Sequence, residues 1–466
     1  MNKKKKINYI NVSERRVLLR IFDILSVLIG IFTIARILEV QYLPIDADKS
    51  IQWISIYLVY FMVFGSIFEM YDLKTSSARY SIFQSIFITA FTSVLFYLFT
   101  PIITPSFPND RIDVLFLFLA VLVPVTIWRV IYSTFIFSPR LVKNIMVIGN
   151  EKRVKHILQT IKNKNVQVNI ICYVSDTEIQ GLEDYKYMPI KGANLRQIAE
   201  ETVIDEIIIS KNSIDLTQTP DISKQLIFLF EHGINIKSIA NYYEEITLRV
   251  SEENLTGNFY KHVSFSKNHE NTFYLMFVRL ADIVISLIGL SSFVVFLPIV
   301  LLGNLIGNRG PLFYKQVRVG RNGEHFSIYK FRSMVVNAES EGKAVWAKKN
   351  DMRITPFGKF MRKTRIDETP QFINILLGEM SLIGPRPERP EFVGNLKNEI
   401  PFYAIRHVIP PGLTGWAQVM YPYANTIEEQ GVKLRYDLYY VRSRGLLLDF
   451  KIILKTISTV LKFKGQ

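Results

Sequence analysis

Long uninterrupted hydrophobic runs dominate the first third of the chain. Four runs, at about 17–42, 51–71, 81–104 and 114–137, each approach the roughly twenty residues that a helix needs to cross the hydrocarbon core of a bilayer. No charged residue occurs between Ser81 and Pro108, which argues against four buried helices of a soluble protein. We therefore expect residues 1–138 to form four transmembrane helices.

The charges between these runs predict their orientation. Cytoplasmic loops are enriched in lysine and arginine. The first, third and fifth connecting segments contain Lys3 to Lys6, Arg15, Arg16, Lys74, Arg79, Arg140 and Lys143, whereas the other two contain Asp46, Asp48, Lys49, Asp110 and Arg111. Both ends of the helical bundle are therefore predicted to lie in the cytoplasm.

After Pro139 the hydrophobic pattern changes to short apolar strands separated by amphipathic helices. Strands are predicted at 144–149, 168–174, 206–210 and 234–239, with helices at 152–161 and 221–231. This alternation is typical of a parallel sheet with helices on both faces, so residues 139–243 are predicted to form a Rossmann-like α/β domain. Its first turn, Gly149-Asn-Glu-Lys-Arg153, has one glycine where a dinucleotide site has three, which favours a degenerate scaffold or regulatory domain over a nucleotide site.

A fifth apolar run, Ile283 to Gly303, follows a predicted linker at 244–273 and has no charged residue. Its length fits a transmembrane span, but lysines and arginines flank it on both sides, so both flanks look cytoplasmic. Pro298 interrupts the backbone hydrogen bonds inside the run. These features favour a re-entrant helix at 279–305 over a fifth full span, and residues 274–466 then form a cytoplasmic domain.

Composition narrows the class of ligand. The formal charge of +15 indicates an anionic partner, and 49% hydrophobic residues make a membrane surface and phosphorylated ligands better candidates than nucleic acid. No helix-turn-helix, zinc-ligand spacing or aromatic RNA-binding motif supports nucleic-acid binding. The single cysteine, Cys172, excludes an intrachain disulfide and is consistent with a mostly cytoplasmic chain.

The strongest candidate for chemistry is the stretch 362–387. Asp367 and Glu368 are adjacent, Arg362 and Arg365 precede them, and Arg386 follows in a Gly-Pro-Arg-Pro turn. One carboxylate can act as a nucleophile while the other binds a divalent metal, and the cations can bind phosphate oxygens. The alternative is a simple helix start, with acidic residues and Pro370 in its first turn.

The segment Gly310 to Met334 has turn signals at Gly320 and Asn322-Gly323 and ends in Lys330, Phe331 and Arg332. It is predicted to form a β-hairpin. Its cations either belong to the candidate site or are solvated charges on a surface ribbon.

Together these motifs resemble the bacterial sugar transferases, the monotopic polyprenol-phosphate phosphoglycosyl transferases. The resemblance covers about Arg279 to Phe463. Relatives often have Ser-Pro at the bend of the membrane hairpin, whereas here Leu297 precedes Pro298. The matching segments are RLAD at 279–282, YKQVRVGRNG, YKFRSM, TPFGKFMRKTRIDETPQFINILLGEMSLIGPRPE and PGLTGWAQV.

The resemblance implies an activity and roles for the residues. Such enzymes transfer hexose 1-phosphate from a UDP-sugar to undecaprenyl phosphate, release UMP, and initiate exopolysaccharide, capsule or O-antigen repeat units. By this resemblance Asp367 forms a phosphosugar-aspartyl intermediate and Glu368 binds Mg²⁺. The implied phosphate-binding residues are Lys330, Arg332, Arg362, Arg365 and Arg386.

The resemblance also implies a place in the cell and an assembly. It puts the catalytic domain on the cytoplasmic face of the bacterial inner membrane and predicts a homodimer, the commonest symmetric assembly. Glucose and galactose are both compatible with the sequence, and frequency in the family favours glucose.

Two alternatives remain at this point. A Mg²⁺-dependent transferase without a covalent intermediate would use Asp367 only as a second metal ligand. A membrane-anchored scaffold or regulator would act through the α/β domain and perform no chemistry.

Overall fold

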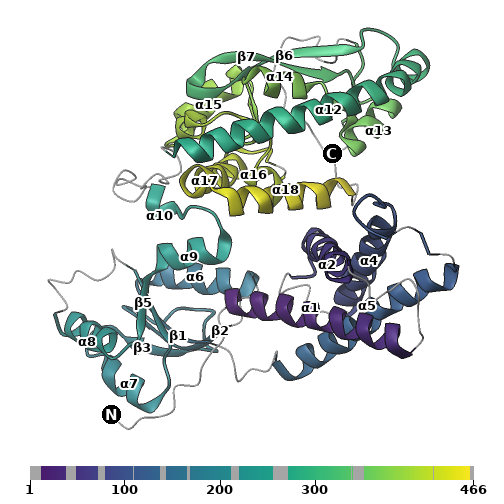
Figure 1. Ribbon diagram of the computed structural model, residues 1–466. Helices are drawn as coiled ribbons and strands as arrows, with labels where there is room; N and C mark the ends of the chain where they lie inside the picture. The colour runs from purple at the N-terminus through teal and green to yellow at the C-terminus, as the bar shows by residue number, and fades with distance from the viewer. Residues whose placement is uncertain are drawn as a thin grey trace. The chain divides into compact units, whose positions relative to one another are not determined.

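The computed structural model divides into two compact units, 1–246 and 247–466, which are described separately (Figure 1). The middle of the predicted linker, 256–270, lies outside the residues that the structure describes, as do the N-terminal lysines. The described residues are 12–37, 49–71, 79–105, 107–108, 110–136, 143–164, 168–210, 220–255, 271–336, 338, 351–422 and 424–461.

Four apolar helices occur where the four hydrophobic runs predicted them. They are α1 (Val12–Ile37), α2 (Ser50–Ile67), α4 (Arg79–Leu98) and α5 (Arg111–Ile131), the last continued by a π-helical turn, η1 (Tyr132–Ile136). By length and composition, segments in α1, α2 and α5 are long enough to span a membrane, whereas the apolar part of α4, Ile82–Leu98, is shorter. The predicted run to residue 104 was too long because Pro101 disfavours helical backbone at the residue before it.

The interior of this bundle contains a buried ion pair. Arg129 of α5 donates from Nε to Asp23 Oδ1 of α1 at 2.9 Å, and both side chains are almost fully buried. A Cβ on Gly30 would meet the carbonyl oxygen of Ala120 at 1.8 Å, so only glycine permits this approach of α1 to α5. The pair and the glycine together fix how the two helices pack.

The rest of the first unit confirms the predicted parallel sheet. The strands are β1 (Lys143–Ile148), β2 (Val168–Ser175), β3 (Lys186–Pro189), β4 (Glu206–Ile209) and β5 (Asn235–Ser238), in the order β3-β2-β1-β4-β5 with every pairing parallel. The helices are α6 (Glu151–Asn163), α7 (Leu195–Glu201), α8 (Pro220–Glu231) and α9 (Ile239–Thr247).

Alternation along the strands gives this sheet two separate cores. Met146 and Ile148 of β1 pack with the residues of α7 and α8, whereas Ile145 and Val147 pack with α6 and α9. Successive side chains of a strand point to opposite faces, so one apolar strand supplies both layers. Strand β3 was not predicted.

The second unit contains short elements around one long helix and a hairpin. Strands β6 (Phe313–Val319) and β7 (His325–Phe331) form the predicted antiparallel hairpin, and Asn322 has a left-handed φ of 56° in its turn, η4 (Arg321–Gly323). The other elements are α10 (Glu252–Leu255), α12 (Thr272–Gly307), α13 (Pro356–Thr364), η5 (Ile366–Glu368), α14 (Gln371–Leu377), β8 (Ser381–Ile383), α15 (Pro390–Glu399), η6 (Tyr403–Val408), β9 (Gly412–Thr414), α16 (Trp416–Met420), α17 (Ile427–Ser443) and α18 (Leu446–Leu461).

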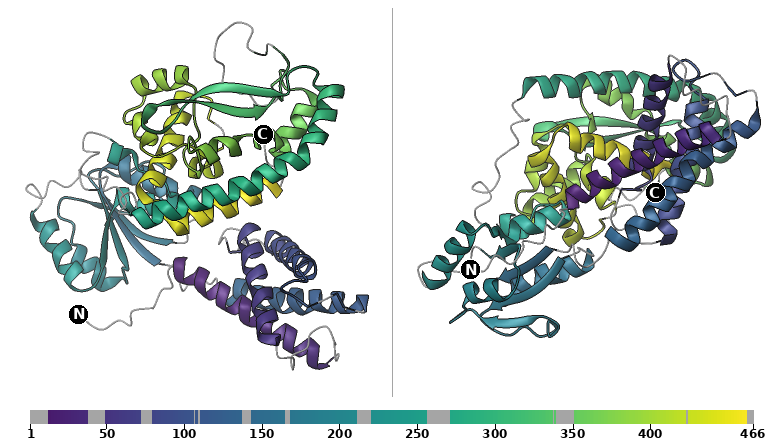
Figure 2. Two further views of the ribbon diagram at one scale, coloured as in Figure 1. Left: turned by 45° about the horizontal axis from the view of Figure 1, so that its top comes forward. Right: turned by 60° about the horizontal axis from the view of Figure 1, so that its bottom comes forward.

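Helix α12 is continuous over 36 residues, with Pro298 inside it, and is therefore roughly 54 Å long. Its axis bends toward its C-terminal end (Figure 2, left). Two glycines bring aromatic rings against it, because a Cβ on Gly289 would meet the ring of Phe372 at 2.4 Å and a Cβ on Gly303 would meet the ring of Phe357 at 2.1 Å. One side of α12 thus packs on the rest of the second unit along much of the helix.

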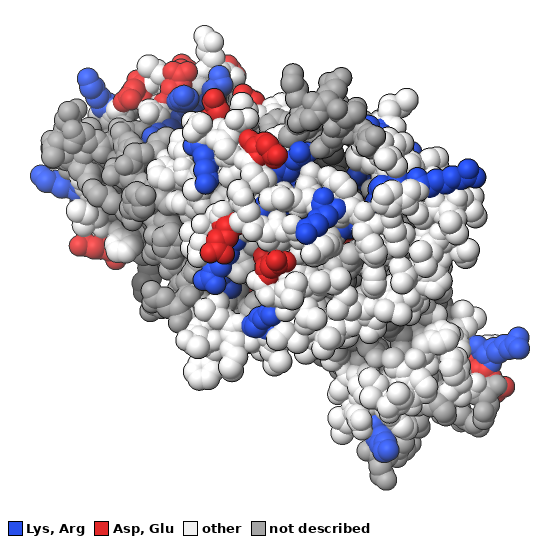
Figure 3. Space-filling view, turned by 90° about the horizontal axis from the view of Figure 1, so that it is seen from above, with Lys and Arg blue, Asp and Glu red and all other residues white. Residues whose placement is uncertain are grey.

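The other side of α12 is apolar and exposed. Helix α18 runs in roughly the same direction (Figure 1) and also exposes leucine and phenylalanine side chains, including Leu447 and Phe450. On the face drawn in Figure 3, acidic and basic side chains are interspersed among broad uncharged areas and form no continuous patch of one sign. The exposed apolar residues of α12 include Phe273, Met276, Leu280, Ile288, Val295, Leu302 and Ile306.

Candidate active site

The two adjacent carboxylates lie on a tight turn between two short helices. Helix α13 begins at its N-cap Thr355, whose hydroxyl accepts a hydrogen bond from the backbone N–H of Gly358 at 2.9 Å. It ends at Arg365, which adopts a left-handed conformation with φ of 62°. That conformation costs an arginine roughly 1–2 kcal/mol, and such strain tends to occur at functional sites. The following 3-10 turn, η5, contains Asp367 and Glu368 and leads into α14.

Glu368 is buried and bound by three cations. Lys330 Nζ, at the end of β7, lies 2.9 Å from Glu368 Oε1, and Arg386 Nη2 lies 3.4 Å from the same oxygen. Arg365 Nη1 lies 3.1 Å from Oε2. Burial by itself raises the pKa of Glu368, but the charges of Lys330, Arg365 and Arg386 outweigh it and hold the pKa well below its ordinary value. Glu368 is therefore a stable carboxylate.

Asp367 is buried too, but its environment differs. Its Oδ1 atom has no hydrogen-bond partner among the described residues. Burial and then the neighbouring charge of Glu368 raise the pKa of Asp367, while Lys330, Arg362 and Arg365 oppose that rise. Two neighbouring acids thus have pKa values shifted in opposite directions, a pattern typical of groups with different roles in one site. The unpartnered oxygen of Asp367 is available to attack an electrophile or to bind a metal.

Five of the seven predicted site residues lie together: Asp367, Glu368, Lys330, Arg365 and Arg386. The other two, Arg362 and Arg332, make different contacts. Arg362 acts on Asp367 through its charge and donates from Nε to Ser333 Oγ at 2.8 Å. Arg332 is not directed at Glu368. Its guanidinium donates to the carbonyl oxygens of Pro311 and Met334 and to Asn304 and Asn308 at the end of α12. Arg332 therefore joins α12 to the end of the hairpin.

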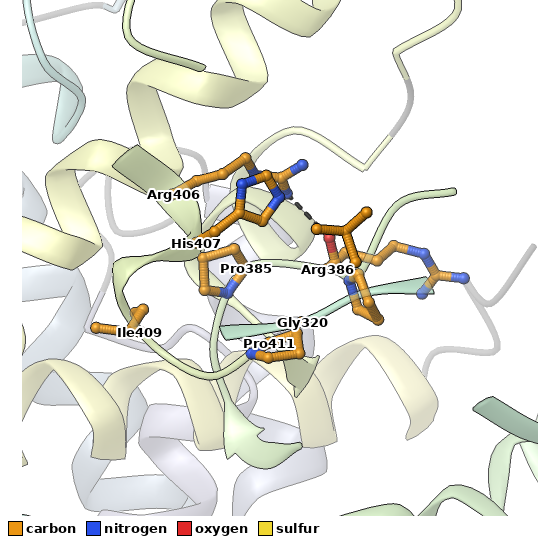
Figure 4. Close-up of a pocket in the computed structure, with 9 residues that line it drawn as sticks. Gly320, Pro385, Arg386, Arg406, His407, Ile409 and Pro411 are labelled. Atoms are coloured by element: carbon orange, nitrogen blue, oxygen red, sulfur yellow. Dashed lines mark hydrogen bonds between the residues drawn. The ribbon is translucent and has the colours of Figure 1, made fainter. Parts of the chain in front are cut away.

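A narrow crease lies beside Arg386 and contains residues that sequence reasoning missed (Figure 4). Arg406 donates from Nη2 to the carbonyl oxygen of Arg386 at 3.0 Å, while the Arg386 side chain points away from the crease. Burial, and then the charge of Arg406, lower the pKa of His407 to about 3, so this imidazole is neutral. The lining residues are Val319, Gly320, Pro385, Arg386, Pro387, Arg406, His407, Ile409 and Pro411.

The carboxylates of Asp367 and Glu368 could bind Mg²⁺ only together with oxygen atoms from water or from a phosphorylated substrate. Among the described residues no group of three or more histidine, cysteine, aspartate or glutamate side chains is placed to bind a metal. Mg²⁺ is commonly bound by one or two carboxylates together with water and phosphate oxygens of a substrate. Glu368 and the unpartnered oxygen of Asp367 fit that arrangement, and the nearby cations fit a phosphorylated substrate.

Comparisons with known proteins identify the family. A family model described as bacterial sugar transferase matches residues 273–463. The chain is 30% identical over 326 residues to a UDP-glucose:undecaprenyl-phosphate glucose-1-phosphate transferase of Xanthomonas campestris pv. campestris, an alignment that covers 69% of this chain and 67% of that relative. The chain therefore belongs to the bacterial sugar transferase family.

Two further relatives differ in extent and in the sugar that their names give. A UDP-glucose:undecaprenyl-phosphate glucose-1-phosphate transferase of Klebsiella pneumoniae is 31% identical over 294 residues, which is 63% of this chain and 61% of the relative. A UDP-N-acetylgalactosamine-undecaprenyl-phosphate N-acetylgalactosaminephosphotransferase of Aeromonas hydrophila is 51% identical over 152 residues, 33% of this chain and 36% of the relative. The chain thus spans less than two thirds of each of these two proteins.

Proposed function

We propose that this protein transfers hexose 1-phosphate from a UDP-sugar to undecaprenyl phosphate, releases UMP, and thereby initiates polysaccharide synthesis. The observation that carries the proposal is the pair of buried neighbouring acids, in which Glu368 is bound by three cations while Asp367 keeps an unpartnered oxygen. Family membership and the names of the relatives support the same reaction.

In the first step Asp367 attacks the β-phosphorus of the UDP-sugar. A bond forms between its carboxylate oxygen and that phosphorus, the bond from the phosphorus to the bridging oxygen breaks, and UMP leaves with that oxygen. A carboxylate is already ionised near neutral pH and needs no base, so its obstacle is repulsion by the anionic diphosphate. Lys330, Arg362, Arg365 and Arg386 offset this repulsion.

In the second step a phosphate oxygen of undecaprenyl phosphate attacks the same phosphorus. The bond between Asp367 and the phosphorus breaks, which gives the lipid diphosphate sugar and restores the carboxylate. Mg²⁺, when bound at Glu368, supplies further neutralisation of the diphosphate. The same cations serve both steps because both transfer a phosphoryl group at one position.

We further propose that α12 is re-entrant and holds the site at the inner surface of the membrane. Polar contacts connect α12 to the globular part near its N-terminal end and at its C-terminal end. Arg279 donates to the carbonyl oxygens of Ile375 and Leu376, and Asp282 accepts from the backbone N–H of Leu382 at 2.8 Å. At the far end Asn308 donates to the carbonyl oxygen of Arg332. Because one globular part contacts α12 near both ends, a helix perpendicular to the membrane would draw that part, with its polar groups, into hydrocarbon, which is costly.

The decisive experiment is to trap the intermediate. The purified full chain, incubated with Mg²⁺ and a UDP-sugar labelled in its β-phosphate but without lipid acceptor, is expected to retain label, and Asp367→Asn is expected to retain none. The Asp367→Asn variant should also lower the rate of UMP release about a thousandfold or more, as loss of a nucleophile does. Glu391→Gln, at an exposed acid of α15, is the matched control and should behave as the wild type.

The trapping result separates the alternatives. A direct transferase releases UMP only when lipid is present and leaves no label on the protein. A scaffold releases no UMP from any nucleotide sugar, and Asp367→Asn then leaves polymer production in cells unchanged.

The sugar is a separate question with two candidates. Glucose or galactose follows from the sequence expectation and from the longer alignments. N-acetylgalactosamine is favoured by the higher identity, 51%, to the Aeromonas relative over the shorter alignment. A panel of UDP-glucose, UDP-galactose and UDP-N-acetylgalactosamine, compared by kcat/KM for UMP release, decides between them. The homodimer stays a prediction.

A further inference from the structure

Helix α17 buries charged side chains that the proposed chemistry does not use. Lys433 and Asp437 are 8% and 1% exposed and lie four residues apart, on the same face of the helix. Buried charges normally need partners. Lys433 Nζ lies 2.7 Å from Glu388 Oε1, and Asp437 Oδ2 lies 2.7 Å from Arg406 Nη2.

Both partners of α17 lead to the turn that carries Arg386. Arg406 donates to the carbonyl oxygen of Arg386, as the dashed line in Figure 4 shows. Glu388 is two residues further along the same turn, and Arg318 donates from Nη1 to the carbonyl oxygen of Pro387 at 3.1 Å. Three consecutive residues of the turn therefore contact side chains from three elements. Arg386 contacts η6, Pro387 contacts β6 and Glu388 contacts α17.

The charges of these partners cancel in pairs. Asp437 neutralises Arg406, and Lys433 neutralises Glu388. Although burial raises the pKa of Glu388, the charges of Lys433, Arg406 and Arg318 lower it to about 2, so Glu388 is ionised at neutral pH. The guanidinium of Arg386 therefore keeps its charge available toward Glu368 and toward an anionic substrate.

We propose that Arg406, kept in place by Asp437, is a positioning residue that aims Arg386 at the reacting phosphate. This inference rests on the proposed function. The Arg386 guanidinium contacts Glu368 at 3.4 Å, the longest of the three cation contacts to that carboxylate, so its aim depends on where its backbone is fixed. Small displacements of a positioning group are costly, because a shift of about 1 Å can lower a rate about a hundredfold.

The test is a double substitution, Arg406→Met with Asp437→Leu, in the full-length chain. Removing one member would leave a buried unpaired charge, whereas replacing both by apolar residues is often tolerated. The kcat/KM for UMP release is expected to fall about 10- to 100-fold. In an Arg386→Lys background, which has already lost the aimed guanidinium, the same double substitution is expected to cost less than about threefold, because effects that act through one residue do not multiply.

Arg435→Met is the matched control. Arg435 lies on the same helix and is similarly buried, but it pairs with Glu252 of α10 at 2.8 Å and not with the Arg386 turn. Its substitution should lower the thermal unfolding midpoint about as much as the double substitution, with little effect on kcat/KM. Arg406→Lys keeps a cation beside Asp437 and a donor near the Arg386 carbonyl, so it should retain more activity than the double variant.

The outcomes are distinct. An equal loss of kcat/KM in the wild-type and Arg386→Lys backgrounds, or no loss in either, overturns the positioning role while the wild-type chain still releases UMP. A wild-type chain that releases no UMP from any nucleotide sugar overturns the proposed function and this inference with it. Should the double variant unfold, the more conservative pair Arg406→Gln with Asp437→Asn, which also removes both charges, is measured in the same two backgrounds for the same comparison.

Discussion

The proposed nucleophile, Asp367, can attack only as a carboxylate, so its raised pKa predicts an acid limit on activity above the usual aspartate range. Protonation below this pKa removes the nucleophile, and kcat/KM for UMP release falls as the pH falls through it. Arg365 is one of the cations that lower the pKa of Asp367. Arg365→Gln should therefore move the acid limb of the pH profile of kcat/KM to higher pH, beyond any uniform loss of rate.

The pH at which kcat/KM falls on the acid side distinguishes this electrostatic effect on Asp367 from a loss of substrate binding. Lys359→Gln, an exposed cation of α13, should leave the limb where the wild type has it. A limb that stays in place in Arg365→Gln, or moves to lower pH, would show that some other group limits the reaction at acid pH.

At the level of single residues, the sequence predicted most residues of the candidate site but not the residues that position them. Asp367, Glu368 and Arg365 are neighbours in the chain, and their turn follows from helices on both sides. Arg332 was implied by the resemblance, and in the structure it follows the last residue of β7 and donates to the carbonyl oxygens of Pro311 and Met334. Arg406 and Asp437 were missed because their pairing is long-range. The one local signal concerned Asp437, because charged residues at 433, 435 and 437 alternate with apolar or aromatic residues in the sequence of α17.

At the level of elements, the packing of α12 on α14 depends on one glycine. A Cβ on Gly289 would meet the Phe372 ring at 2.4 Å, so Gly289→Ala should force the two helices apart and cost about 1–3 kcal/mol. The measurement is the thermal unfolding midpoint of the purified chain in detergent. Because α14 follows directly after Glu368, activity should fall together with the midpoint.

Two further variants control this prediction. Gly394 of α15 has nothing within 4 Å of an added Cβ, so Gly394→Ala should be neutral or more stable by about 0.5–1 kcal/mol, since alanine favours a helix interior. Phe372→Leu combined with Gly289→Ala should recover part of the lost stability. An unchanged midpoint in Gly289→Ala would mean that α12 does not pack on the ring as described.

Elements with a clear period were predictable, and those determined by tertiary packing were not. The apolar runs predicted β1, β2, β4 and β5, but β3 is a four-residue edge strand with two exposed end residues and no apolar run. Pro298 predicted a break, yet α12 remains one helix, because proline removes a single backbone hydrogen bond and this part of the helix packs on the globular side. The sequence therefore indicated a membrane helix with an unusual shape but not its continuity.

At the level of the whole molecule, the proposal that α12 is re-entrant requires both units to expose their polar parts on the same side of the membrane. Single-cysteine accessibility tests this directly, because Cys172 is the one native cysteine and is fully buried. Three variants mark the relevant positions: Lys49→Cys between the first two apolar runs, Lys152→Cys on α6, and Lys397→Cys on α15.

In right-side-out membrane vesicles a membrane-impermeant maleimide should label only Lys49→Cys, and in inside-out vesicles it should label only Lys152→Cys and Lys397→Cys. The wild-type chain, with Cys172 alone, gives the background, and solubilisation in detergent should expose all three positions equally. Labelling of Lys397→Cys in right-side-out vesicles would mean that α12 crosses the bilayer. The reaction would then have no access to nucleotide sugars made in the cytoplasm, so this one accessibility decides whether Asp367 can meet the proposed substrate.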